Sequence, residues 1–499
     1  MTLTWRNLGK FFYLKKILIQ QKKEFIMSIY TTTTNGAKAL VSTGSPLVDL
    51  FFSIGALRPS ISKHSTKAAK DKSDKTSAKA AAASKFASAV LFDAELASAI
   101  LLWARDVRNG GAGEREVFHT LFSTLAEADS GLAKKVLDNL EAVGRFDDLE
   151  AAYGTSVETH ALELWSAALK NNNTLAFKWA DRSMKKLREH MGFKNEAEFR
   201  KFISAGRKNS TVETLMCNKQ WSSVKFDKLP SVAGSRYANA FKKNDEARYS
   251  EFISSKETKI NTSALYPHDI YRTYKHGNNA ETATKLWANM PKLSLKENIL
   301  VVADVSGSMT CQASGILTCL DISVSLGTYI SQNTTGAFRN KLMTFSEEPS
   351  LVEIKGNTIT EMFDFVEGIS WGGCTDFEKT YKQILDFACL YNVPQEQMPS
   401  YLLVLSDMQF DEASRDSTHF QNMKQMFEAK GYKLPKIIFW NLNSQYKNAP
   451  VSWKEDNVCM VSGFSPNILK SIVSVDLEQF TAQNIMLKAI EPFVKMIRA

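Results

Sequence analysis

Two short apolar runs, each followed closely by a carboxylate, place the strongest constraint on how this chain can fold. Ile299 to Ala303 lies directly before Asp304 in LVVADVSGSM, and Tyr401 to Leu405 lies two residues before Asp407 in YLLVLSDMQFD. Runs of this length are typical of strands buried on both faces of a parallel sheet. In an open α/β sheet, the loops at the carboxyl ends of the strands converge on one crevice. We therefore expect the two carboxylates to lie close together.

Three hydroxyl residues complete a candidate metal site. Ser306 and Ser308 lie in the DVSGSM segment, and Thr375 lies in WGGCTDF. Oxygen ligands of this kind suit Mg²⁺ or Mn²⁺, and two carboxylates balance one divalent charge. Taken singly, the DVSGSM segment could be a Gly/Ser turn and Asp407 a helix N-cap. The three sequence segments that carry these residues, two of which follow expected strands, together favour a metal site.

The Asp304-x-Ser306-x-Ser308 element, Thr375 and Asp407 resemble the metal-ion-dependent adhesion site of von Willebrand factor A domains. The resemblance implies that a bound Mg²⁺ keeps an open position for a carboxylate supplied by a protein partner. It also implies a doubly wound sheet around the site.

The hydrophobic pattern of the sequence changes near Leu295, which predicts two folded parts of different class. Apolar residues at three- and four-residue spacing predict helices over residues 86–294, stacked as a HEAT-like helical-repeat solenoid; the alternative of a ring is implied only by the family resemblance given below. Residues 295–499 alternate between strands and helices, which predicts a doubly wound domain. The expected strands are 299–304, 339–346, 351–354, 401–406, 435–441 and 457–461, and the expected helices are 314–333, 358–368, 376–391, 415–430, 465–472 and 481–497. The predicted fold class is therefore α + α/β.

Residues 1–85 are predicted to be an N-terminal tail that ends in a low-complexity linker. Ala, Lys and Ser dominate residues 62–85, which favours a flexible and partly helical segment. The codons for Lys22 to Met27 can contain a purine-rich ribosome-binding sequence and a start codon, so residues 1–26 could be upstream sequence read in frame. On this hypothesis, translation starts at Met27 and the gene belongs to a bacterium or a bacteriophage.

Larger segments of the chain resemble an uncharacterised Ro-like family of bacteriophages, giant viruses and plants, related to the TROVE-type Ro proteins. The resemblance rests on WARDVRNGGAGER (103–115), GRFDDL (144–149), YPHDI (266–270), FWNL (439–442), VSGFSP (461–466) and the metal-site motifs. In Ro proteins a ring of helical repeats binds structured or misfolded small RNAs, and an A domain closes the ring. RNA is therefore the partner that the resemblance implies.

Basic residues concentrate in one segment of the helical part. Between Lys178 and Lys243 there are sixteen basic and six acidic residues, whereas the whole chain carries a net charge of +9. Such a segment is typical of a polyanion-binding face, although a solvated surface of two helices would have the same composition. The candidate RNA-binding residues are Lys185, Lys186, Arg188, Arg200, Lys201, Arg207 and Lys208. By contrast, the charges at Arg105, Asp106, Arg108, Glu114 and Arg115 favour a buried salt-bridge network over RNA contact.

Two classes of function stay open from the sequence. The first is an RNA-binding scaffold with a metal-dependent protein-docking site, and the second is a protein–protein adaptor with no nucleic-acid role. We expect no enzyme, because the candidate metal site contains no positioned general base. The dispersed Cys and His residues and the absence of a long apolar run favour a cytoplasmic protein without a membrane segment, in a host cytoplasm if the gene is from a phage.

Overall fold

The computed structural model describes residues 30–32, 38–40, 44–61, 72–207, 212–255, 257–262, 265–293, 295, 297–314, 317–344, 346, 348–369, 377–407, 417–442, 458–462 and 481–499. Up to residue 288 the described chain is almost entirely helical. Beyond residue 298 it alternates between strands and helices, as the sequence predicts. No helix in the described ranges is both long and apolar enough to cross a membrane.

The helical part begins with α2 (Pro46–Ile61) and α3 (Lys72–Phe92), which the sequence analysis places in a tail and a linker. Both helices pack in the main core, where Leu50, Ile54 and Phe86 are fully buried. The sequence analysis expects a flexible and partly helical segment over residues 62–85; residues 72–85 are helical, and their flexibility stays a prediction. Alanine and lysine are strong helix formers, and the apolar end of α3 supplies the burial that such a segment needs.

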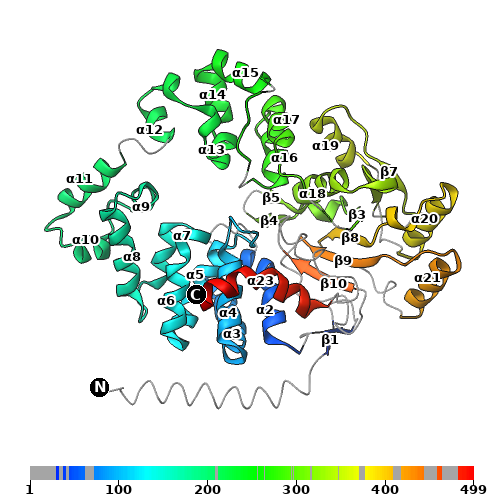
Figure 1. Ribbon diagram of the computed structural model, residues 1–499, viewed down its shortest axis with the longest axis horizontal. Helices are drawn as coiled ribbons and strands as arrows, with labels where there is room; N and C mark the ends of the chain where they lie inside the picture. Colours follow the sequence, from blue (N-terminus) through cyan, green and yellow to red (C-terminus); the bar gives the residue numbers. More distant parts are fainter. Residues whose placement is uncertain are drawn as a thin grey trace.

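The helices that follow are short, and their connections differ in length. They are α4 (Ala94–Arg105), α5 (Arg115–Ala128), α6 (Ser130–Asp138), α7 (Leu140–Val143), the 3₁₀ helix η1 (Phe146–Ala152), α8 (Glu158–Lys170), α9 (Thr174–Trp179), α10 (Lys185–His190), α11 (Glu196–Gly206), α12 (Val212–Cys217), α13 (Ser231–Arg236), α14 (Ala238–Asn244), α15 (Glu246–Ser254), α16 (Pro267–Lys275) and α17 (Ala280–Ala288). Figure 1 shows them following one another along a curved path. Their assignment to HEAT-like repeats stays a prediction.

The second part contains a sheet of six strands in the order β10-β9-β8-β3-β6-β7. The strands are β3 (Ile299–Ala303), β6 (Lys341–Thr344), β7 (Leu351–Glu353), β8 (Tyr401–Ser406), β9 (Lys436–Asn441) and β10 (Val458–Ser462). All neighbours are parallel except β6 and the edge strand β7. Each strand matches an expected strand, and the mixed, mainly parallel sheet confirms the predicted α/β class.

Alternate residues of β3 face two different hydrophobic layers, as the period of a strand requires. Val301 and Ala303 pack in the same core as α18 (Cys319–Asn333) and the C-terminal helix α23 (Ala482–Arg498). Leu300 and Val302 pack in a second core with α20 (Phe377–Leu390) and α21 (Ser417–Ala429). The helix α19 (Ile359–Glu367) lies beside α17 and α18.

The helix α18 begins five residues later than the sequence analysis expects. A short hairpin of β4 (Gln312–Ser314) and β5 (Leu317–Thr318) takes its place. The reason is a capping box, in which Thr318 Oγ1 accepts from the Asp321 amide and Asp321 Oδ2 accepts from the Thr318 amide, both at 3.1 Å. This reciprocal pair defines where the helix starts.

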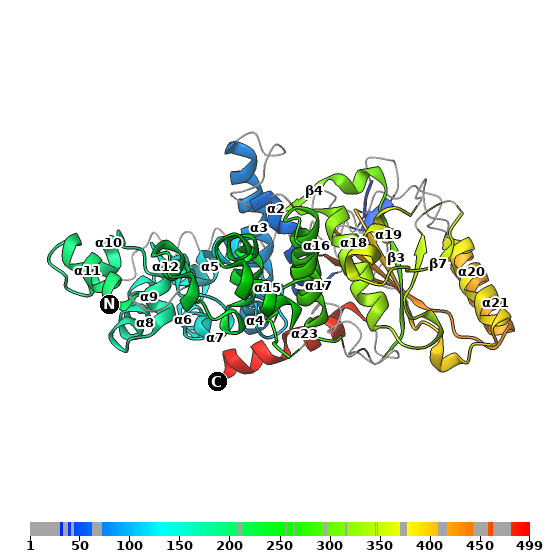
Figure 2. The same ribbon diagram turned by 90° about the horizontal axis from the view of Figure 1, so that it is seen from above.

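The described elements form a closed circuit (Figure 1). The path runs from α2–α4 through α8–α15 to α16 and α17, enters the sheet, and returns with β10 and α23 to α2 and α4. Seen edge-on, the helical part and the sheet part lie end to end, and α23 spans the boundary between them (Figure 2).

Candidate metal centre and basic helices

The candidate metal centre lies where the strand order of the sheet reverses. Strand β3 pairs with β6 on one side and with β8 on the other, and Ala303 is in register with Leu405. Because crossovers leave β3 and β8 in opposite directions, a crevice forms at their carboxyl ends. Asp304 and Asp407 lie there, one residue beyond each strand.

Asp304 is a buried carboxylate with both oxygens engaged. Oδ1 accepts from the Ser306 amide at 2.9 Å, Oδ2 accepts from the Ser406 hydroxyl at 2.9 Å, and the Asp304 amide donates to the Leu405 carbonyl at 2.9 Å. Burial raises the pKa of Asp304, and the hydrogen bonds from Ser306 and Ser406 offset part of that effect. A buried carboxylate of this kind gains from a nearby cation.

The two serines of the motif lie on a short turn next to Asp304. Ser306 precedes the 3₁₀ turn Gly307–Thr310, Ser308 lies within it, and the fully buried Met309 anchors the turn in the core. The hydroxyl oxygens of Ser306 and Ser308 lie 2.9 Å apart. Both side chains are half-buried, so they remain reachable from solvent.

Asp407 is also buried, at 1% exposure, at the end of β8. The hydrogen bond with Cys311 and burial raise the pKa of the Cys319 thiol, and the charges of Asp407 and Asp304 add to that effect. The two carboxylates therefore act on the same small region of the structure.

Four of the five predicted ligand residues thus lie at the same edge of the sheet, after β3 and β8, and Thr375 lies outside the described residues. Asp304, Ser306, Ser308 and Asp407 offer only oxygen donors, a set that fits Mg²⁺ or Mn²⁺. No group of three or more His, Cys, Asp or Glu side chains suited to a metal occurs in the described ranges. The candidate centre has only two carboxylates beside its hydroxyl groups and does not form such a group. Its assignment as a metal site stays a prediction.

Ser406 is a residue that the sequence analysis does not single out. It is fully buried as the last residue of β8, and its hydroxyl holds the Asp304 carboxylate. The only available signal is a hydroxyl residue that interrupts the apolar run directly before Asp407.

Four of the seven candidate RNA-binding residues are exposed on α10 and α11, at the left of Figure 1. They are Lys185, Lys186, Arg200 and Lys201. Three of them have acidic neighbours: Lys185 lies 3.9 Å from Glu189, Lys186 lies 2.7 Å from Glu158, and Arg200 lies 2.5 Å from Glu196. Exposed ion pairs of this kind are weak, so another anion can take the place of the carboxylate.

The other three candidates differ in their surroundings. Arg188 is half-buried beside Glu189, and Lys208 lies outside the described residues. The Arg207 guanidinium donates to the carbonyls of Phe177, at 2.7 Å, of Lys178 and of Ala180. Arg207 therefore caps the C-terminal end of α9, and its side chain serves the fold.

The aromatic residues among these basic helices are mostly core residues. Phe199 is fully buried, and Phe193 packs against it and against Phe202 with ring centroids 5.5 Å and 5.2 Å apart. Trp179 is half-buried, and the Arg145 guanidinium lies 3.9 Å from its ring centre. The charged groups are consequently the principal exposed feature of α10 and α11.

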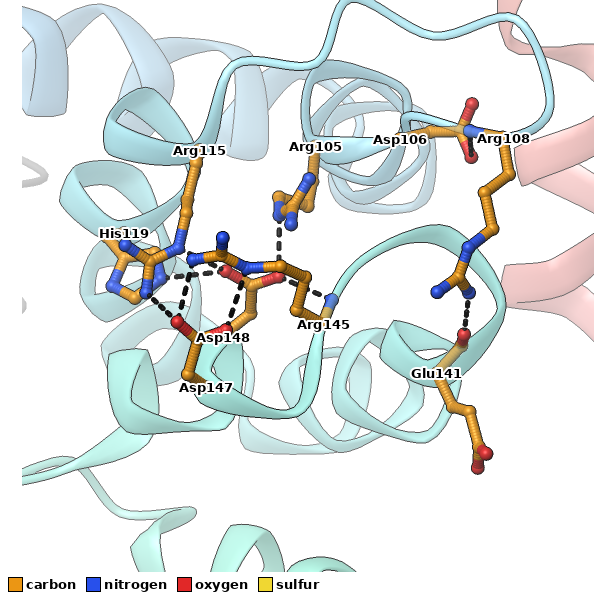
Figure 3. A network of polar contacts seen from close by, with 9 residues as sticks. All are labelled: Arg105, Asp106, Arg108, Arg115, His119, Glu141, Arg145, Asp147 and Asp148. Carbon is orange, nitrogen blue, oxygen red and sulfur yellow. Dashed lines mark hydrogen bonds and ion pairs between the residues drawn. The ribbon is translucent and has the colours of Figure 1, made fainter. Parts of the chain in front are cut away.

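A second polar cluster joins α4, α5 and η1, and Figure 3 shows Asp148 at its centre. Asp148 Oδ2 accepts from Arg105 Nε at 2.6 Å and from the Arg145 amide at 2.8 Å. Oδ1 accepts from Arg115 Nε at 2.9 Å and lies 3.0 Å from His119 Nε2. Burial alone would raise the pKa of Asp148, but the His119 hydrogen bond and the Arg105 charge outweigh it and hold this pKa far below its usual range.

The neighbouring Asp147 and Gly144 complete the cluster. Asp147 bridges Arg115 and Arg145, with N–O distances of 2.7 to 2.9 Å. A Cβ at Gly144 would lie 2.6 Å from Asp148 Oδ2, so only glycine fits there. The preference of the sequence analysis for a salt-bridge network at Arg105 and Arg115 is confirmed.

The loop after α4 is held in a similar way. Asp106 accepts from the amides of Asn109 and Gly111 at 2.7 and 2.8 Å, and Arg108 donates to the Glu141 carbonyl (Figure 3). These bonds fix the connection between α4 and α5 against α7.

Comparisons with known proteins divide the chain where the fold changes. Residues 163–300 match a family model described as domain of unknown function DUF2828, and residues 298–491 match one described as DUF7788. The uncharacterized protein L728 of Acanthamoeba polyphaga mimivirus is 27% identical over 334 residues, which cover 62% of this chain and 57% of that protein. The chain therefore spans little more than half the length of this relative. These similarities fit a protein family with a member in a giant virus.

Proposed function

We propose that the protein is a Ro-like RNA-binding scaffold whose C-terminal part, of von Willebrand factor A type, docks a protein partner through Mg²⁺. The observation that carries the metal-dependent half is the meeting of Asp304, Ser306, Ser308 and Asp407 at the carboxyl ends of β3 and β8. No catalytic step is part of the proposal.

In this proposal the serines and the aspartates have different roles. The Ser306 and Ser308 hydroxyls, 2.9 Å apart, would coordinate the ion directly. Asp304 and Asp407 would balance its charge, with Asp304 held in place by Ser406. When bound, Mg²⁺ would supply a Lewis-acidic position that accepts a carboxylate from the partner.

Calorimetric titration with Mg²⁺ and Mn²⁺ tests the metal-dependent half. We expect Asp304→Ala and Asp407→Ala each to abolish metal binding while circular dichroism shows an intact fold. Asp386→Ala is the matched control, because Asp386 is an exposed carboxylate on α20 of the same part. Metal binding that persists undiminished in both variants would place the ion elsewhere.

The RNA-binding half of the proposal rests on the exposed charge of α10 and α11 together with the resemblance to Ro proteins. In the 178–243 segment, Lys185, Lys186, Arg200 and Lys201 expose their side chains, and so do Arg182, Lys194, Lys219, Lys225, Lys228, Arg236, Lys242 and Lys243. Phosphate groups of an RNA could replace the weak acidic neighbours of these side chains. The closed circuit of helices and sheet is the architecture that the resemblance implies.

Binding of a structured small RNA with a single-stranded end, measured over a range of salt concentrations, tests this half. If about six phosphates are neutralised, affinity falls about a thousandfold between 50 and 200 mM salt. Replacing Lys185, Lys186, Arg200 and Lys201 by Gln should weaken binding and lower the salt slope by about 3. The same replacement at the exposed Lys355, Lys382, Lys430 and Lys433 of the C-terminal part removes equal charge and should leave binding unchanged.

A protein–protein adaptor is the second candidate function, in which the helical part is another protein platform. Absence of RNA binding at low salt, or a salt slope unchanged by the four Gln replacements, would favour it. Metal binding at Asp304 would be retained in either case.

A further inference from the structure

Two cysteine thiols lie close to the Gly307–Thr310 turn of the candidate metal centre. Cys311 follows the Gly307–Thr310 turn, Cys319 opens α18, and their sulfur atoms are 3.5 Å apart. Cys311 is half-buried, whereas Cys319 is fully buried and its thiol lies 3.3 Å from the Leu442 carbonyl. The sulfur atoms are soft donors that a hard cation does not recruit, so the metal proposal leaves them without a role.

The backbone brings the two residues together. Gln312 pairs with Thr318 in the β4–β5 hairpin, and Cys311 and Cys319 are the next pair outward, with the Cys319 amide donating to the Cys311 carbonyl at 3.1 Å. The sulfur atoms are already 3.5 Å apart, so a disulfide needs only a small approach of the two residues.

We propose that Cys311 and Cys319 are a redox-active dithiol, which closes to a disulfide by exchange with a small-molecule disulfide such as glutathione disulfide. In the first step the Cys311 thiolate attacks one sulfur of glutathione disulfide, and the other glutathione leaves as a thiolate that takes up a proton. In the second step Cys319 loses its proton and attacks the Cys311 sulfur, which releases the second glutathione. Two cysteine thiols are oxidised and one glutathione disulfide is reduced to two thiols.

The surroundings assign different roles to the two sulfurs. Cys311 is half-buried and can be reached by glutathione disulfide, whereas Cys319 is fully buried behind it. Cys311 is therefore the attacking group, and Cys319 is the resolving group.

A consequence for the metal centre rests on the proposed function. Forming an S–S bond of about 2.05 Å shortens the separation of the sulfurs by about 1.5 Å. Cys311 accordingly moves toward α18, and it pulls on the turn that carries Ser308, whose carbonyl accepts from the Cys311 amide at 3.0 Å. Displacing a metal ligand in this way should lower metal affinity about tenfold.

Peptide mass spectrometry after treatment with glutathione disulfide tests the dithiol. Trypsin releases residues 297–339, which contain Cys311 and Cys319 and no other cysteine. We expect this peptide to lose two hydrogens and to regain them with dithiothreitol. In Cys319→Ser the peptide should instead keep one glutathione on Cys311, and in Cys311→Ser it should stay unmodified. Cys389→Ser, which removes an exposed cysteine on α20, should leave the disulfide unchanged.

Two outcomes contradict the inference in different ways. If Cys217 and Cys389 react with glutathione while residues 297–339 show no loss of two hydrogens, the pair is not redox-active. If the disulfide forms but calorimetry shows the same Mn²⁺ affinity before and after reduction, the coupling to the metal centre is rejected. A reduced protein that binds no Mn²⁺ would refute the proposed metal site and leave the disulfide result standing.

Discussion

The Ser406 hydroxyl is a single contact on which the position of a predicted metal ligand depends. It donates to Asp304 Oδ2 at 2.9 Å from a fully buried position. Ser406→Ala should let the carboxylate rotate and lower Mg²⁺ affinity about 10- to 100-fold, as measured by calorimetry. Ser325→Ala removes an equally buried hydroxyl that bonds only to carbonyls of its own helix, and it should leave affinity unchanged. Equal affinities in the two variants would contradict the positioning role.

Asp148 differs from Ser406, because its charge stabilises the fold and not the candidate metal centre. Its carboxylate accepts from Arg105, Arg115 and the Arg145 amide and lies beside His119, so Asp148→Asn leaves the buried Arg105 guanidinium without its carboxylate partner. We expect a loss of about 3–5 kcal/mol in the free energy of unfolding, measured with urea. The more exposed Asp147 is the control, and Asp147→Asn should cost less. Equal losses would show that burial does not decide the effect.

The same carboxylate predicts how stability depends on pH. The pKa of Asp148 in the fold lies far below 3.8, the value expected when it is unfolded. The folded state therefore binds this proton less readily than the unfolded state. The stabilisation is complete above the unfolded pKa and is lost as pH falls toward the folded pKa. Between pH 5 and 3 the urea midpoint of Asp148→Asn should fall less than that of the wild type.

At the residue scale, the sequence predicts groups that chemistry makes conspicuous. The Asp304 and Asp407 positions follow from apolar runs that end in carboxylates, and the structure places both at one edge of the sheet. The role of Ser406 and the capping of α9 by Arg207 depend on contacts between segments distant in sequence. No local pattern specifies such contacts. The sequence therefore does not distinguish Arg207 from the other basic residues between Lys178 and Lys243.

At the scale of elements, the helical part meets the sheet part through a polar seam between α16 and α19. Lys275 lies 2.8 Å from Asp364 and 2.7 Å from Glu367, and the Tyr274 hydroxyl donates to Asp364 at 2.6 Å. These contacts are partly exposed, so Lys275→Met should cost about 1 kcal/mol. Hydrogen exchange of α16 and α19 should rise selectively. Lys382→Met, on the exposed face of α20, is the control that should change neither helix.

The elements that the sequence predicts best are those with a strong period. Each strand of the sheet and the helices near 358–368, 376–391 and 481–497 match, because burial on one or both faces determines their patterns. The full extent of α3 is not apparent from the sequence, since its Ala and Lys residues give no apolar period before Phe86. The hairpin at 312–318 is absent from the expected elements because a two-strand turn of this size has too few residues to show a period.

At the scale of the whole molecule, the two ends of the folded chain hold the circuit together. Lys135 donates to the Ile497 carbonyl at 2.9 Å, and Arg498 pairs with Glu95 at 3.0 Å. Helix α23 adds an apolar face that packs with α4 in the main core. A contact between residues some 400 positions apart produces no local sequence pattern. The expectation of a closed ring therefore comes only from the resemblance to Ro proteins.

The apolar face of α23 makes this closure testable with two substitutions on one helix. Ile490 is fully buried in the main core, whereas Leu487 is 37% exposed. Ile490→Asp places an unpaired charge in the core at a cost of several kcal/mol, which should detach α23 from α4. Small-angle scattering should then report a larger radius of gyration, and hydrogen exchange in α4 should rise. Leu487→Asp adds the same charge at the surface and should change neither reading. If both variants keep the wild-type radius and the protection of α4, the circuit does not depend on α23, and contacts of α2 with β10 must hold it closed.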